Sequence, residues 1–287
     1  MKKEIVMRTR ILTALVALCV LIPVLIFSHT WLFPIGVAVC CLIALWEIFK
    51  CIGVKSLWVT IPTYLVAAFL ILSFRFFREM YSLGTDAFIV RIAIPCILFA
   101  ALYLMGAMVF SRGKLPVESV TAAGFLSFYI VAAFLCILFL RDADRGAYTY
   151  LLIFIGAWIT DSFAYFTGML FGKHKLIPEI SPKKTIEGSI GGILFCGASF
   201  ILYGVLIGHF FENAERMNLV ALFAYGVIVS VVSQIGDLSM SAVKRHYGIK
   251  DFGKIFPGHG GILDRFDSIL AVSLVLFVLN EFAHIFH

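Results

Sequence analysis

Long apolar segments make up most of this 287-residue chain, and they restrict its fold more than any other feature. A helix needs roughly 20 apolar residues to cross a bilayer. Nine segments approach or exceed that length: residues 11–28, 31–49, 56–74, 87–110, 117–140, 149–171, 189–211, 219–243 and 266–286. They lack the alternation of apolar and polar residues that is typical of membrane barrels. The sequence therefore predicts an all-α polytopic membrane protein with about nine transmembrane helices.

The distribution of Lys and Arg predicts the orientation of these helices, because cytoplasmic loops carry an excess of cations. With a cytoplasmic N-terminus, 17 of the 23 Lys and Arg residues fall in predicted cytoplasmic segments. The first apolar run lacks a small-x-small cleavage site, so we interpret it as a retained helix and not a signal peptide. Nine helices then place the C-terminus outside. The same bias accounts for the net charge of +6, so we expect no nucleic-acid partner.

Polar chemistry is distributed unevenly along the chain. Residues 1–148 are mostly apolar helices with short loops, which we expect to be scaffold and lipid contact, and they include Glu47 near a helix end. Residues 149–287 form a predicted catalytic region with cytoplasmic loops at 172–188 and 244–265. Since no long linker separates the two parts, we expect one integrated membrane domain.

Two aspartates lie inside predicted spans, where an ionisable group is costly unless it is paired, binds a metal or lines a wet cavity. Asp161 lies about twelve residues into the sixth span. Asp237 shares a helical face with Ser241, Lys244 and Arg245, at spacings of four, seven and eight residues. We expect Asp161 to line a functional cavity, although a structural aspartate bonded between helices is the alternative. A capped helix end with snorkelling cations would explain Lys244 and Arg245 but not Asp237.

The loop after this helix combines Lys250 with glycines and ends in Asp264 and Arg265. Glycines such as Gly260 and Gly261 let backbone amides approach an anion closely. Carboxylates on two different helices, Asp237 and Asp264, are the minimum for binding a hard cation such as Mg²⁺.

A further cationic segment lies in loop 172–188, which contains Lys173, Lys183 and Lys184 together with hydroxyl side chains. Such lysines commonly only set the topology, and that alternative stays open. Because the segment directly follows the Asp161 helix, we interpret it as a contact for a triphosphate or a lipid phosphate. Three histidines could act as bases, although a lone loop histidine more often has no chemical role: His174, His246 and His259.

Residues 241–267 match, without a gap, the pattern Ser-x-x-Lys-Arg, four residues, Lys-Asp, a spacer, Pro-Gly-His-Gly-Gly, two residues, Asp-Arg-x-Asp. In this pattern the chain resembles the phosphatidate cytidylyltransferases, also called CDP-diacylglycerol synthases. The resemblance extends upstream through residues 161–165 and 181–188, and it covers the first half only by hydropathy. Phe163 departs from it, since a smaller residue is expected there.

The resemblance implies that CTP and phosphatidate react to give CDP-diacylglycerol and pyrophosphate, at a cytoplasmic face of what we expect to be a bacterial inner membrane. It implies catalytic roles for Asp237, Asp264, Lys244 and Arg245. It also implies Mg²⁺ on Asp237 and Asp264, with a second cation possible, and a possible homodimer. Implied substrate-binding residues are Ser241, Lys250, Arg265, Gly260, Gly261, Lys173, Lys183, Lys184 and Asp161.

Two other functions remain open on the residues alone. A CTP-dependent lipid or polyprenol kinase would need the same nucleotide, metal and amphipathic acceptor. An ion-coupled transporter would also use intramembrane carboxylates, although the concentration of polar residues at one edge and the lack of an inverted repeat disfavour it.

Overall fold

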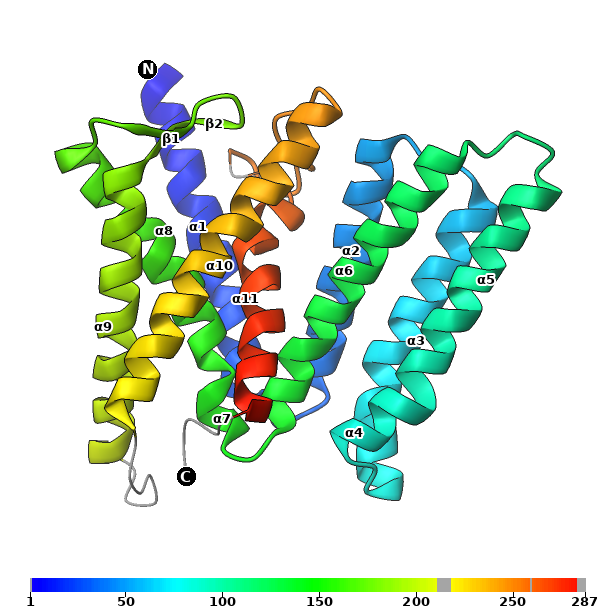
Figure 1. Cartoon of the computed structure of the whole chain (residues 1–287), viewed down its shortest axis with the longest axis horizontal. Helices are drawn as coiled ribbons and strands as arrows, with labels where there is room; N and C mark the ends of the chain where they lie inside the picture. The colour runs from blue at the N-terminus through cyan, green and yellow to red at the C-terminus, as the bar shows by residue number, and fades with distance from the viewer. Residues whose placement is uncertain (1, 211–217, 259, 283–287) are drawn as a thin grey trace. The chain divides into compact units, whose positions relative to one another are not determined.

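The computed structural model describes residues 2–210, 218–258 and 260–282, with side chains at Thr13 and from Leu15 onward. The described chain is almost entirely helical (Figure 1), which confirms the predicted fold class. Its helices are α1 (Lys2–Ile26), α2 (Leu32–Ile52), α3 (Leu57–Tyr81), α4 (Thr85–Phe88), the π-helical turn η1 (Ile89–Ala93), α5 (Ile94–Phe110), α6 (Val117–Asp142), α7 (Gly146–Thr149), α8 (Leu151–Phe171), α9 (Ile186–Phe210), α10 (Leu219–His246) and α11 (Leu263–Phe282).

Seven helical stretches among the described residues are long and apolar enough to cross a membrane: Leu32–Ile52, Leu57–Tyr81, Thr85–Phe110, Val117–Asp142, Gly146–Phe171, Ile186–Phe210 and Leu219–His246. The chain is therefore an integral membrane protein. Helix α1 contributes a shorter apolar stretch, Leu15–Ile26, and α11 carries several charged residues within its length. The count of nine spans and the orientation of the termini stay predictions.

The helices form two compact units, which share α6 and α11 between them. The first unit contains Met1–Leu138 and Ile249–Arg265, and the second contains Phe139–Gly248 and Phe266–His287. The predicted division at residue 148 stays a prediction, and these compact units divide the chain differently. As a result, the sequence pattern of residues 241–267 belongs partly to each unit.

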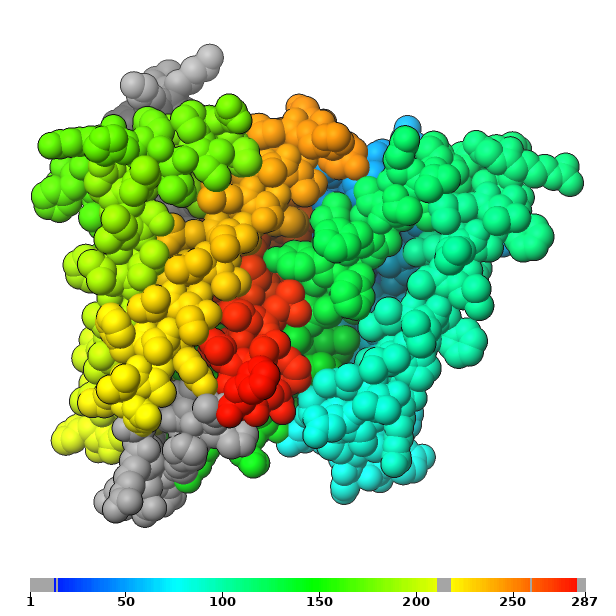
Figure 2. Space-filling model, viewed as in Figure 1, coloured from blue at the N-terminus to red at the C-terminus, as the bar shows by residue number. Residues whose placement is uncertain are grey.

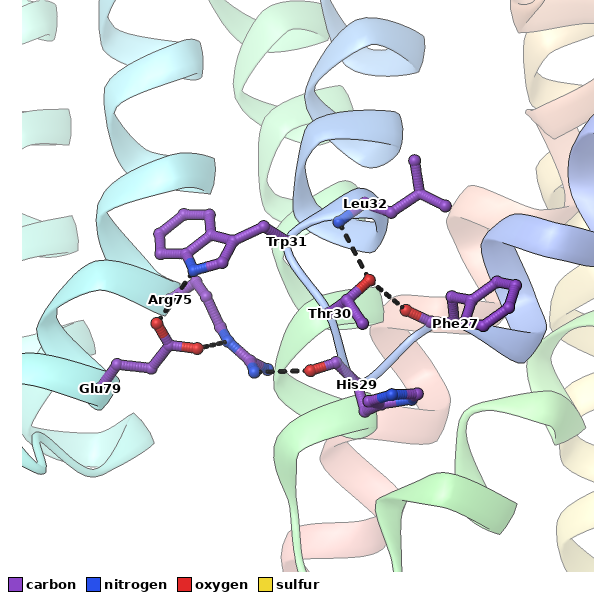
Figure 3. A network of polar contacts seen from close by, with 7 residues as sticks. All are labelled: Phe27, His29, Thr30, Trp31, Leu32, Arg75 and Glu79. Atoms are coloured by element: carbon purple, nitrogen blue, oxygen red, sulfur yellow. Dashed lines mark hydrogen bonds and ion pairs between the residues drawn. The ribbon is translucent and has the colours of Figure 1, made fainter.

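In the first unit, α3 packs against α2 and α5. A polar network, shown in Figure 3, ties the connection between α1 and α2 to the end of α3. The indole N–H of Trp31 donates to Glu79 at 3.0 Å, and Arg75 binds the same carboxylate at 2.5 Å. Arg75 also donates to the carbonyl oxygen of His29 at 2.7 Å. This network fixes the entry into α2, the helix that carries Glu47.

In the second unit, α8, α9 and α10 approach one another closely through glycines. A Cβ atom at Gly188 would lie 2.5 Å from the carbonyl oxygen of Ala164, and one at Gly226 would lie 2.7 Å from the Cα of Gly197. Helix α10 meets α11 in the same way, because a Cβ at Gly236 would lie 2.5 Å from that of Ala271. Small residues at these contacts let backbones approach as membrane helices commonly do.

Loop 172–188 contains a feature that the sequence analysis did not predict, an antiparallel hairpin of β1 (Lys175–Ile177) and β2 (Ser181–Thr185). Local contacts hold its two ends. The Thr185 hydroxyl accepts the N–H of Gly188 at 3.1 Å, which satisfies one of the unpaired amides at the start of α9. At the other end, the His174 ring lies 2.6 Å from Glu187. Lys175, Lys183 and Lys184 are thus carried on an ordered hairpin.

Candidate active site

The end of α10 arranges its polar residues as the helical spacing predicts. The Ser241 hydroxyl donates to Oδ1 of Asp237 at 3.3 Å, across one helical turn. Lys244 is buried and Arg245 is exposed at the end of the helix. Cations in the last turn are favourable because they face the negative end of the helix dipole.

The hairpin contacts this helix at two points, both within the second unit. Lys184 Nζ lies 2.5 Å from Oδ2 of Asp237, and each side chain is about a quarter exposed. Arg245 Nε donates to the carbonyl oxygen of Ile180 at 3.5 Å. Figure 2 shows the hairpin and the end of α10 together at the surface of this unit. Lys173 and Lys183 are exposed on the same segment.

Asp161 on α8 is exposed, and its Oδ2 accepts a hydrogen bond from the Ser268 hydroxyl of α11 at 3.3 Å. Next to Ser268, Asp267 is buried, and it lies within electrostatic range of Asp161, Asp237 and Lys244. The second unit therefore brings together carboxylates from α8, α10 and α11. Asp267 was not among the predicted site residues, although it closes the Asp-Arg-x-Asp pattern that could have identified it.

The segment between α10 and α11, residues 249–262, is called the signature loop, and several of its backbone N–H groups donate to Asp264. Oδ2 of this buried aspartate accepts backbone N–H groups from Phe252 at 2.8 Å, Gly261 at 2.9 Å and Gly253 at 3.4 Å. Gly260 adopts φ +85°, a conformation that favours glycine, and its carbonyl accepts the N–H of Phe256 at 2.9 Å.

These contacts give the glycines of the signature loop a role that the sequence analysis did not consider. The Gly261 amide donates to Asp264 in this structure. A phosphate-binding role for Gly260 and Gly261 stays a prediction. The cations of the loop and of the first turn of α11 are exposed: Lys250, Lys254 and Arg265. His259 lies outside the described residues.

Glu47 is the functional candidate that the sequence analysis missed. This α2 residue has no exposed surface, and its carboxylate accepts the N–H groups of Ile262 at 3.1 Å and Leu263 at 2.8 Å. The sequence predicts only scaffold and lipid contact for residues 1–148. The signal that could have identified it was a carboxylate inside an otherwise apolar helix.

The residues present are compatible with a magnesium ion, although they do not form an all-protein cage. Within the described ranges, no three His, Cys, Asp or Glu side chains gather closely enough to hold a metal ion. Mg²⁺ is commonly bound through one or two carboxylates together with substrate phosphates. Asp237 supplies such an oxygen donor, and a cation already lies beside it in the form of the Lys184 ammonium. Asp237 and Asp264 belong to different units, and their joint binding of a metal stays a prediction.

Comparison with known proteins adds evidence that extends over both units. The model of the cytidylyltransferase family matches residues 8–283. Proteins named phosphatidate cytidylyltransferase from Staphylococcus haemolyticus (strain JCSC1435) and Staphylococcus aureus (strain COL) are each 34% identical over 273 residues. That alignment covers 95% of this chain and 98% of each relative. The protein of Staphylococcus epidermidis (strain ATCC 12228 / FDA PCI 1200) that has this name is equally similar. Because the match runs through the Asp237 helix, the hairpin and the signature loop alike, the chain belongs to the cytidylyltransferase family.

Proposed function

We propose that this protein transfers CMP from CTP to phosphatidate, giving CDP-diacylglycerol and pyrophosphate, as a step in phospholipid biosynthesis. The observation that carries the proposal is the 34% identity to phosphatidate cytidylyltransferases over 95% of the chain. The polar face of α10 and the signature loop supply cations and carboxylates suited to two phosphorylated reactants.

In this reaction an oxygen of the phosphatidate phosphate attacks the α-phosphorus of CTP in line. A new P–O bond forms, the bond from the α-phosphorus to the bridging oxygen breaks, and pyrophosphate leaves with the electron pair. Both reactants are anions, so catalysis consists mainly of positioning and charge neutralisation. A phosphate monoester has a second pKa near 6, so the attacking oxygen is already ionised near neutral pH and no general base is needed.

The proposed roles follow the charges of each segment. Lys244 and Arg245 at the end of α10 would bind phosphate groups, with Ser241 donating a hydrogen bond. Lys250 and Arg265, which are exposed in the first unit, would bind the triphosphate. The remaining proposed contacts with phosphate groups are Gly260, Gly261, Lys173, Lys183 and Lys184, and Asp161 is proposed to line the substrate cavity.

Asp237 and Asp264 would hold Mg²⁺, which when bound supplies charge neutralisation to the phosphates, and a second cation is possible. In the present structure the Lys184 ammonium forms an ion pair with the Asp237 carboxylate. We propose that Lys184 exchanges this carboxylate for a substrate phosphate. The ion pair then keeps both groups correctly placed and paired before substrate arrives.

The proposed location is the bacterial inner membrane with the site facing the cytoplasm, since the hairpin and the signature loop carry most of the loop lysines. The acyl chains of phosphatidate would stay in the bilayer while CTP enters from water. A homodimer is proposed from the family resemblance alone, and the mass of the purified protein in detergent tests it.

Purified protein with phosphatidate and CTP labelled at the α- or γ-phosphate tests the reaction. The α-label should enter the lipid with release of pyrophosphate. Incorporation of the γ-label would instead identify a lipid kinase, and the absence of either product would exclude both reactions.

A further inference from the structure

Glu47 is a buried carboxylate to which the proposed reaction assigns no role. It lies on α2, within a helix long and apolar enough to span a membrane, and none of its surface is exposed. Burying a charge is costly unless hydrogen bonds or an opposite charge compensate it. The partners of Glu47 therefore indicate why a carboxylate is present at this position.

Backbone amides at the start of α11 supply that compensation. Oε1 of Glu47 accepts the N–H of Ile262, and Oε2 accepts the N–H of Leu263. The first amides of a helix have no partner within the helix, and they carry the positive end of its dipole. Glu47 thus caps α11 from a helix that lies more than 200 residues earlier in the chain.

Two glycines of the signature loop pack directly against the same carboxylate. A Cβ atom at Gly253 or at Gly261 would overlap Oε1 of Glu47. The Cβ at Gly253 would also lie 3.0 Å from the Cα of Gly261, so the two glycines and the carboxylate form one tightly packed contact. Glu47 therefore restrains the loop sterically as well as through hydrogen bonds.

Glu47 and Asp264 together accept backbone amides from both ends of this segment. Asp264 accepts the backbone N–H groups of Phe252, Gly253 and Gly261. Glu47 accepts those of Ile262 and Leu263. The backbone is held by buried carboxylates, whereas Lys250, Lys254 and Arg265 remain exposed. The anions face inward and the cations face outward.

We infer that Glu47 is a positioning residue for nucleotide transfer. It does not touch substrate, and it acts by fixing the backbone conformation in which the signature loop presents Lys250 and Arg265 to the CTP triphosphate. This inference rests on the proposed function for its substrate. The restraint of the loop itself can be measured without any substrate.

The primary test is Glu47→Gln, which keeps the shape of the side chain. In glutamine an NH₂ group replaces one of the two carboxylate oxygens. The backbone N–H of Ile262 or Leu263 then faces a donor and loses its acceptor. We expect KM for CTP to rise about tenfold, with KM for phosphatidate changed less than about twofold. Glu79→Gln is the matched control, since it removes a bonded glutamate of the same unit that is not in contact with the signature loop.

Tryptic cleavage of the solubilised protein reports on the loop independently of activity. Cleavage after Lys250 and Lys254 should become several-fold faster in Glu47→Gln, while cleavage after Arg112 and Lys114 in the same unit stays unchanged. Equal acceleration at all four sites would mean general destabilisation and would overturn the inference, as would no acceleration. If the loop responds as expected but the wild type makes no CDP-diacylglycerol, the proposed function fails and the restraint stands.

A second variant decides the matter if Glu47→Gln does not accumulate. Gly253→Ala keeps the carboxylate and crowds it, and it should give the same cleavage pattern and the same rise in KM for CTP. Its added effect should be smaller in a Glu47→Ala background, where the overlapping atoms are gone. Wild-type cleavage and KM in Gly253→Ala would overturn the inference.

Discussion

The ion pair between Lys184 and Asp237 gives a quantitative prediction about the ligand-free protein. At their separation of 2.5 Å, two unit charges attract by about 1.7 kcal/mol in water and about 7 kcal/mol at an effective dielectric constant of about 20. Each side chain is roughly a quarter exposed but the Lys184 Nζ atom itself is buried, so the attraction lies between these limits, and desolvation of the buried ammonium removes much of the gain. We therefore expect a coupling free energy of about 1–2 kcal/mol.

A double-mutant cycle measures this coupling. Lys184→Met and Asp237→Asn each remove one charge with little change in length, and thermal unfolding is followed in detergent for both single variants and the double variant. The fall in the unfolding midpoint of the double variant should be smaller than the sum of the two single falls by about 3–6 °C, because the second substitution removes a group that has already lost its partner. A control cycle of Lys184→Met with Glu79→Gln should be additive, since Lys184 pairs with Asp237 whereas Glu79 pairs with Arg75. Additivity within about 1 °C in the first cycle would refute the ion pair.

Three further predictions concern helix packing, metal and topology. Gly236→Ala should destabilise the protein by about 1–3 kcal/mol, because its Cβ would meet that of Ala271 and approach the carbonyl oxygen of Asp267. Adding Ala271→Gly should restore part of the lost thermal stability, and equal stability of the wild type, the single variant and the double variant would contradict the close contact. Chelation by EDTA should abolish formation of CDP-diacylglycerol, and added Mg²⁺ should restore it. Asp237→Asn should lose about two orders of magnitude in kcat/KM at every Mg²⁺ concentration, and near-wild-type activity of this variant would exclude Asp237 as a metal ligand. Lys183→Cys should react with an impermeant thiol reagent in inverted membrane vesicles and not in intact cells, and the opposite pattern would reverse the predicted topology.

Local sequence patterns predicted the helices and the arrangement within α10. Apolar length identifies a membrane helix because the bilayer has a fixed thickness. The contact of Ser241 with Asp237 follows from the four-residue spacing of a helical turn. Both depend only on neighbouring residues, and the structure confirms the helical fold class and this contact, whereas the count of nine spans stays a prediction.

Contacts between distant segments could not be predicted in this way. The pairing of Lys184 with Asp237 depends on a hairpin whose lysine-rich sequence is equally compatible with a topogenic loop. Glu47 is one carboxylate in an apolar helix, and its partners are backbone amides, which leave no trace in the sequence. Asp267 belonged to the recognised pattern, but its burial beside Asp161 and Asp237 depends on how α8, α10 and α11 pack.

The capping of α11 by Glu47 has a consequence for the order in which the protein is made. Leu263 follows Glu47 by 216 residues, which at 5–20 residues per second corresponds to about 10–40 seconds of synthesis. During that interval α2 contains a carboxylate whose eventual partners do not yet exist. The first unit therefore cannot reach its final state until residues 262 and 263 have been synthesised. A chain that stops before Ile262 loses more than its last helix, because it leaves Glu47 in α2 without the amides that compensate its charge.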